Sequence, residues 1–312
     1  MCCLVANYHT TSAFVNIMNA INSLHKAIPD TPAYSETFSL ICDQPYEEYW
    51  LNKCIKCKNC KGFSEKYTDK LENSQCAQWA TWKNDKEKLI KVIEDGSVKE
   101  LSDHIVSLIP QFLEHCYIKR RQSSSYQKER FNAETKSKDY DPFHALIQVD
   151  FSENYTCVSQ DEIQSAHWKQ SQVSIFTVAI WHSGSLKSYA FVSDNLAHSK
   201  DTVVAYIDFA LDQLPDIVNS VSIWSDGPCS QFKNRYIFDS IAHLEKRHSV
   251  SISWNFFATS HCKGPVDGIG GSVKRFVLGK VKTRHHMVNN AQSFSLAAEE
   301  MQHVNAVHMG AP

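Results

Sequence analysis

The stretch VNSVSIWSDGPCSQFKN, residues 218–234, joins an apolar run to a turn and a polar segment. The run VNSVSIW is typical of a buried strand, and Asp226 lies at its tip. The following Gly227 and Pro228 break the strand, and a helix is expected over residues 231–247. Asp226 therefore has two interpretations: it caps that helix, or it brings a carboxylate to a site at the end of the strand.

On both sides of this stretch, strand-like apolar runs are separated by short turns or by segments with helical periodicity. Strands are predicted over residues 144–151, 171–181, 186–194, 218–224 and 249–258, and helices over residues 199–214, 231–247 and the later part of 264–282. Three strands followed by alternating helices and strands indicate an α/β fold with a mixed five-stranded sheet and flanking helices.

The first half of the chain is predicted to be mainly helical. Apolar residues at helical spacing indicate helices over residues 78–91 and 97–116, and Pro110 is expected to kink or break the second. The polar segment 122–140 is expected to be an exposed connection or a mobile helix end. The sequence predicts a helical region over residues 1–140, an α/β domain over 141–285, and a tail or truncated remainder over 286–312.

The N-terminal half also carries a cluster of cysteines. The chain has eleven cysteines, an odd number that favours reduced thiols or metal ligands over a disulfide framework. The run CIKCKNC spaces Cys54, Cys57 and Cys60 so that their thiolates can converge on one ion, with Cys42 or Cys76 as fourth ligand. The sequence predicts a structural Zn²⁺ site, and the alternative is a set of free thiols in a Lys-rich loop.

Overall charge does not indicate a strongly basic nucleic-acid binder, since the net charge is -2 and the pI is about 6.7. Two local basic segments, residues 119–130 and 273–286, favour an anionic partner. No apolar run approaches the ~20 residues of a membrane span, and the N-terminus lacks the pattern of a signal peptide. We therefore expect an intracellular protein with no membrane partner.

Three carboxylates occupy related positions in the predicted fold. Asp150 ends the first strand in LIQVDFSENY, Asp226 ends the fourth, and Asp267 begins the last helix in HCKGPVDGIGG. Clustered carboxylates repel one another unless a cation lies between them, and two divalent ions bridged by such acids suit phosphoryl transfer. Oxygen ligands favour Mg²⁺ or Mn²⁺. Glu245 is the rival third acid, although a solvated helix face also explains it.

This arrangement resembles the ribonuclease H-like catalytic domain of cut-and-paste DNA transposases, whose metal-binding triad is Asp, Asp and then Asp or Glu. The motifs DFSENY, QSAHW, SDGPCSQFKN and HCKGPVDGIGG also look like those of transposon-derived proteins in animal genomes. The resemblance covers residues 131–282 and implies that Asp150, Asp226 and Asp267 hold two Mg²⁺ ions for DNA strand cleavage and strand transfer. It further implies DNA as partner and a location in the nucleus, and it is compatible with a homo-oligomer.

Basic residues near these motifs are candidates for phosphate contacts, with solvated surface as the alternative. They are Lys233, Arg235, Lys263, Lys274 and Arg275. The glycines of GIGG, which follow Asp267, either let the backbone approach a phosphate or permit close packing on the sheet.

Two other functions remain open from the sequence. One is a catalytically inactive, domesticated transposon-derived module that binds nucleic acid or protein. The other is a ribonuclease H-like nuclease acting in repair or RNA processing.

The cysteine cluster yields a direct prediction. Protein purified without chelator should contain about one zinc per chain, because the thiolates in CIKCKNC converge on one ion. Elemental analysis measures this, and a folded, reduced protein without zinc would leave these cysteines as ordinary thiols.

Overall fold

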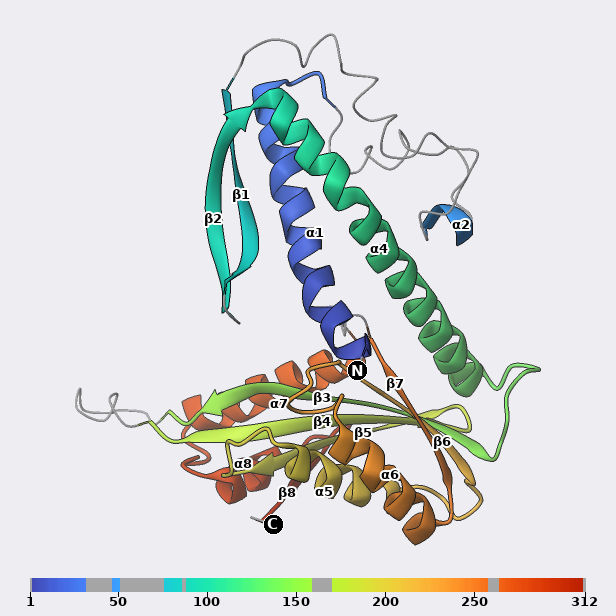
Figure 1. Ribbon diagram of the computed structural model, residues 1–312. Helices are drawn as coiled ribbons and strands as arrows, with labels where there is room; N and C mark the ends of the chain where they lie inside the picture. The colour runs from blue at the N-terminus through green and yellow to red at the C-terminus, as the bar shows by residue number, and fades with distance from the viewer. Residues whose placement is uncertain are drawn as a thin grey trace. The chain divides into compact units, whose positions relative to one another are not determined.

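The computed structural model describes residues 2–31, 47–50, 76–85, 88–158, 170–257 and 264–310. The chain forms two compact units, Met1–Arg121 and Gln122–Pro312, and helix α4 contributes residues to both (Figure 1). None of the described helices is long and apolar enough to cross a membrane.

The first unit combines helices with a two-stranded hairpin. Its elements are α1 (Cys2–Ala27), α2 (Glu47–Trp50), β1 (Cys76–Asp85), β2 (Lys88–Ser97) and the first part of α4 (Val98–Thr135). Buried side chains of α1, β1 and α4 form one apolar cluster that includes Leu24, Trp79, Leu101 and Phe112. Asn16 of α1 exchanges two hydrogen bonds with the backbone of Trp82, which satisfies polar groups at the edge of β1.

One prediction for this region is wrong. Residues 78–85 and 88–91 belong to the antiparallel β1–β2 hairpin rather than to a helix. The buried side chains Ala77, Trp79 and Thr81 alternate with exposed or half-buried ones, which is the period of a strand.

The helix predicted over residues 97–116 is present as part of α4. Pro110 lies inside α4 without ending it, and the helix continues to Thr135, so most of the segment 122–140 is a helix end and not a connection.

The second unit contains a mixed six-stranded sheet, one strand more than predicted. The strand order is β7-β6-β3-β4-β5-β8, with β3, β4 and β5 antiparallel and β6, β7 and β8 each parallel to a neighbour. The strands are β3 (His144–Thr156), β4 (Gln172–His182), β5 (Ser185–Ser193), β6 (Ser220–Ser225), β7 (Ser251–Phe256) and β8 (Asn305–His308). The mixed α/β architecture predicted from the sequence is confirmed, and β8 extends it beyond β5.

Helices cover both faces of this sheet (Figure 1). They are α5 (Lys200–Leu211), α6 (Arg235–His248), α7 (Pro265–Lys282) and α8 (Ala291–Ala298). One apolar core joins the sheet to α7, α8 and the end of α4, and a second joins the other face to α5 and α6. Successive residues of β3 therefore serve opposite faces, with Leu146 in the first core and Ile147 in the second.

Helix α7 lies very close to β3 because glycines face the strand. A Cβ atom added to Gly264 would lie 2.6 Å from Nε2 of Gln148, and one added to Gly270 would lie 2.8 Å from Cβ of Ser152. Real Cβ atoms do not approach other atoms so closely, so any larger residue would push the helix away from the strand. Close packing on the sheet is thus the structural role of Gly270 in GIGG.

Gly270→Ala should destabilise the protein by about 1–3 kcal/mol, because the added methyl group overpacks the contact with Ser152. Gly268→Ala is the matched control: it lies in the same helix with open space around it, and it should stabilise by up to ~1 kcal/mol through helix propensity. Urea unfolding of both variants measures the difference. Equal stabilities for the two variants would contradict the close helix–strand contact.

Candidate acidic site at the ends of β3 and β6

The strand register brings Asp150 and Asp226 to the same edge of the sheet. Gln148 of β3 pairs with Trp224 of β6 in parallel register. Asp150 and Asp226 each lie two residues further along, so their side chains emerge beside each other on the face covered by α7. The predicted adjacency of these two strands is confirmed.

Asp267 reaches this edge from α7. Gln148, Asp150 and Ser152 lie along one face of β3, with Gly264, the N-cap of α7, against Gln148 and Gly270 of α7 against Ser152. Asp267 lies between the two glycines in the chain, and its negative charge acts on Asp150. The tight packing of α7 therefore decides where the third carboxylate lies.

The charges of the three acids affect one another. Burial raises the pKa of Asp150 to about 7, and the negative charges of Asp226 and Asp267 contribute in the same direction. Burial also raises the pKa of Asp226, opposed by a hydrogen bond from the Gly227 backbone N–H. Asp150 and Asp226 are half-buried and Asp267 is exposed. The three carboxylates predicted from the sequence thus interact electrostatically in the folded chain.

Two of these carboxylates accept local backbone hydrogen bonds. Asp226 Oδ1 accepts from the N–H of Gly227 at 2.9 Å, and Asp267 Oδ2 accepts from the N–H of Gly264 at 3.1 Å. The interpretation of Asp226 as a helix cap is wrong, because the N-cap of α6 is Asn234, which accepts from the N–H groups of Tyr236 and Ile237. Asp267 does support the start of its own helix.

The three carboxylates are ligands of the type that hard divalent cations bind. Asp150, Asp226 and Asp267 offer only carboxylate oxygens, the ligands that Mg²⁺ and Mn²⁺ prefer. The pKa of Asp150 is raised by burial first and by the charges of the other two acids second, and a cation would balance those charges. In the described part of the chain, no three His, Cys, Asp or Glu side chains form a preformed metal-binding group.

The sequence did not predict the polar support behind Asp150. Gln148 is fully buried two residues before it, and its Oε1 accepts a hydrogen bond from Tyr126 Oη of α4 at 2.5 Å. The ring of Tyr126 packs edge-on against Trp224 and Phe257. A glutamine inside the apolar run HALIQVDF was the available signal, because a buried amide needs hydrogen-bond partners.

A second polar contact between α4 and the sheet centres on Glu129. Its carboxylate accepts from Trp224 Nε1 at 2.9 Å and lies 2.8 Å from His144 Nε2. Burial raises the pKa of Glu129, but hydrogen bonds from His144, Ser222 and Trp224 outweigh it and hold the pKa below its usual value. The end of α4 is therefore fixed on the sheet beside the acidic edge.

The other residues predicted for the site fall in several places. Glu245, the rival third acid, accepts a hydrogen bond from the Ile252 N–H at 2.7 Å and so ties α6 to β7. Lys274 of α7 donates to the Glu153 carbonyl at 3.1 Å, and Arg275 beside it is exposed. Lys233 and Arg235 flank the N-cap of α6. Lys263 lies outside the described residues.

The predicted zinc site stays a prediction. Cys42, Cys54, Cys57 and Cys60 lie outside the described residues. Cys76, the alternative fourth ligand, is the first residue of β1 and carries an exposed free thiol.

Comparison with known proteins gives one family match and remote structural likenesses. Residues 127–311 match the model of a family described as a domain of unknown function, DUF8701. No curated protein matches the chain.

Two solved structures are similar to parts of the chain. One is a simian T-cell lymphotropic virus intasome in complex with PP2A regulatory subunit B56 gamma, with 12% identity and a TM-score of 0.35 over 53% of this chain and 50% of that one. The other is the catalytic core domain of BIV integrase, with 13% identity and a TM-score of 0.28 over 49% of this chain and 80% of that one. The chain thus spans half of the first structure's length. At identities and TM-scores this low, no residue correspondence follows.

The raised pKa of Asp150 predicts a pH-dependent stability in metal-free protein. A carboxyl whose pKa is higher in the folded state than in the unfolded state stabilises below the unfolded pKa, and that stability is lost as pH rises through the folded pKa. Stability should fall between pH ~4 and the folded pKa of about 7, by ~1.4 kcal/mol for each unit of pKa difference.

Asp150→Asn should remove this part of the pH dependence and raise the melting temperature of metal-free protein near pH 8. The exposed turn residue Asp139→Asn is the matched control and should behave as wild type. Mg²⁺ should stabilise the wild type but not Asp150→Asn. Parallel stability curves for wild type and Asp150→Asn would overturn the interaction among the acids.

Proposed function

The chain belongs to the DUF8701 family, a domain of unknown function whose model matches residues 127–311, and we propose that it cleaves and transfers DNA strands. In this proposal the second unit is a ribonuclease H-like domain of the transposase type, and Asp150, Asp226 and Asp267 form its triad. Because its substrate would be chromosomal DNA, we propose that the protein acts in the nucleus.

One observation supports the proposal: burial raises the pKa of Asp150 to about 7, and the negative charges of Asp226 on the neighbouring strand end and of Asp267 on α7 add to that rise. A carboxylate kept buried beside two others costs stability, and a fold retains such an arrangement most readily where a cation relieves it. An acid whose only role is to anchor a helix by a hydrogen bond does not need two further acids beside it.

Each acid has its own place in the proposed chemistry. Divalent ions held by the triad would polarise a phosphodiester and lower the pKa of an attacking water or 3′-hydroxyl. Asp150 lies on β3 behind the buried Gln148, between two paired strands, and would be the fixed ligand. Asp267 is exposed at the start of its helix and would be the adjustable one.

Basic residues around this edge suit a polyanionic substrate. Lys233 and Arg235 precede and begin α6, directly after the loop that follows Asp226, and Lys274 and Arg275 lie on α7 beyond Asp267. We propose these four side chains as contacts to DNA phosphates. Lys263 is proposed with them from the sequence alone.

A second candidate function has its own supporting observation. Asp226 and Asp267 each accept a backbone hydrogen bond within their own turns, which satisfies them without any ion. An inactive derivative that retains the fold and binds nucleic acid or protein would keep these bonds. Loss of catalysis alone would leave it stable.

Asp226→Asn separates the two functions. Asparagine keeps the oxygen that accepts from the Gly227 N–H but loses the charge that holds Mg²⁺, so plasmid nicking should fall by orders of magnitude while the fold persists. Asp216→Asn, an exposed change shortly before β6, is the control and should nick at the wild-type rate. Nicking and melting temperature are measured on the same preparations, and an active, folded Asp226→Asn protein would sink the catalytic role.

A further inference from the structure

A cluster of cations and aromatic rings lies at the start of α6. We call Lys200, Lys233, Arg235, Tyr236 and Phe238 the basic–aromatic cluster. Tyr236 and Phe238 are each 49% exposed although both are large aromatic side chains. Rings this exposed on a folded helix suggest a surface that contacts a partner.

Cation–π contacts hold the cluster together. The Lys200 Nζ lies 3.3 Å from the ring centroid of Tyr236, and the Arg235 guanidinium lies 4.9 Å from it and donates to the Tyr236 hydroxyl at 3.0 Å. Lys233 Nζ lies 5.6 Å from the ring of Phe256, which packs edge-on against Phe238. Tyr236 thus has two cations beside its ring, and Phe238 packs against a ring that a third cation contacts.

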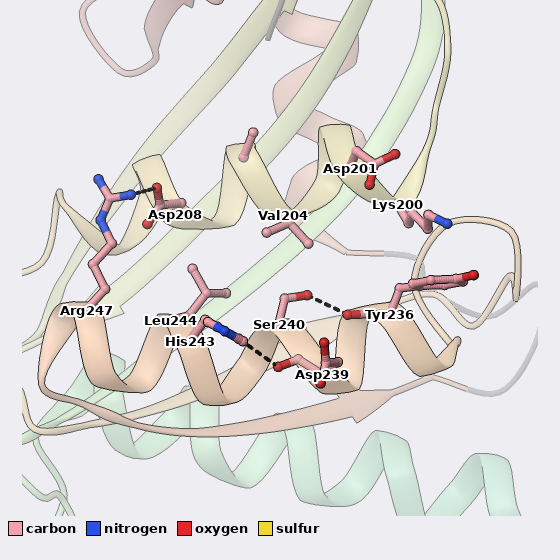
Figure 2. Close-up of a pocket in the computed structure, with 11 residues that line it drawn as sticks. Lys200, Asp201, Val204, Asp208, Tyr236, Asp239, Ser240, His243, Leu244 and Arg247 are labelled. Carbon is pink, nitrogen blue, oxygen red and sulfur yellow. Dashed lines mark hydrogen bonds and ion pairs between the residues drawn. The ribbon is translucent and has the colours of Figure 1, made fainter.

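Among the residues that the structure describes, Lys200, Lys233 and Arg235 form no ion pair with a carboxylate, whereas Arg247 at the far end of α6 pairs with Asp208 at 2.6 Å. Figure 2 shows both ends of the groove of about 520 Å³ between α5 and α6, with Lys200 and Tyr236 at one end and Arg247 and Asp208 at the other. Asp201 and Asp239 also line the groove beside Lys200 and Tyr236. The charge offered to a partner at this end is therefore that of three cations which none of the described carboxylates pairs with.

The ring of Phe151 connects this cluster to the acidic edge. Phe151 follows Asp150 on β3 and points to the opposite face of the sheet. The His198 ring stacks on the Phe151 ring with the two centroids 4.0 Å apart. The centroid of the fully buried Phe232 ring lies 6.2 Å from that of Phe151. His198 lies two residues before Lys200, and Phe232 directly precedes Lys233. Both cation-bearing segments are thus anchored on the residue next to Asp150.

From this geometry we propose that the basic–aromatic cluster binds an unpaired stretch of nucleic acid next to the acidic edge, with bases against Tyr236 and Phe238 and phosphates on the three cations. Aromatic rings beside cations are the combination that single-stranded nucleic acids recognise, because bases stack on rings while the backbone needs positive charge. An acidic peptide would use the cations but not the ring faces. The proposal rests on the proposed function only for what happens at the neighbouring acids.

Binding is measured with the full chain and a labelled oligothymidine of about 16 nucleotides, in EDTA so that no divalent ion takes part. Tyr236→Leu should weaken binding about tenfold or more, and Tyr236→Phe, which keeps the ring, should bind nearly as wild type. Lys200→Gln and Arg235→Gln should each reduce the slope of log affinity against log salt by about 0.7. Lys246→Gln, the same charge change at the exposed other end of α6, is the control and should have a smaller effect.

The controls separate the competing outcomes. Melting temperatures establish that the variants are folded. Wild-type affinity in Tyr236→Leu, or equal affinity of the wild type for polyglutamate, would overturn the proposal in favour of a general anion-binding surface. If the protein does not nick plasmid DNA but still binds oligothymidine in a ring-dependent way, catalysis is rejected and the basic–aromatic site stands. If it nicks plasmid DNA but binding does not depend on the ring of Tyr236, the catalytic proposal stands and this site is rejected.

Discussion

The close contact between α7 and β3 is the constraint on which the acidic edge depends. Gly264 and Gly270 allow the helix to approach until it touches Gln148 and Ser152, and this distance sets Asp267 beside Asp150. A helix with ordinary side chains at these positions would stand further from the strand, and its acid would no longer share a site with the strand acids. The glycines therefore serve the site through packing rather than by contacting a ligand.

The position of Asp150 on β3 depends on polar contacts between the strand and the end of α4. Gln148 cannot remain buried without hydrogen bonds, and Tyr126 from the end of α4 supplies one. Glu129, one turn further along the helix, accepts from Trp224 on the neighbouring strand. The end of α4 thus holds β3 and β6 at the points just before their acids, which explains why it belongs to the same compact unit as the sheet.

The elements predicted correctly from the sequence are those whose apolar pattern fits only one type of secondary structure. β4 is buried along nearly its whole length, so its apolar run predicts a strand and no other element. The adjacency of β3 and β6 was expected from the order of strands and helices along the chain. The hairpin over residues 76–97 was missed because its apolar residues also fit helical spacing. The packing of the end of α4 on the sheet was not predicted because Glu129 packs through hydrogen bonds, which hydropathy does not register. Strand β8 is short and depends on pairing with β5, which no local pattern encodes.

Strand β3 links two different surfaces because its side chains alternate. Asp150 points to the α7 face with the other acids, and Phe151 points to the α5–α6 face, where His198 and Phe232 rest on it. β3 therefore connects the acidic edge to the two segments that carry Lys200 and Lys233. In the proposed complex, a nucleic acid held by those cations would stand in a fixed relation to the acids, since neither surface can shift without moving the strand that both share.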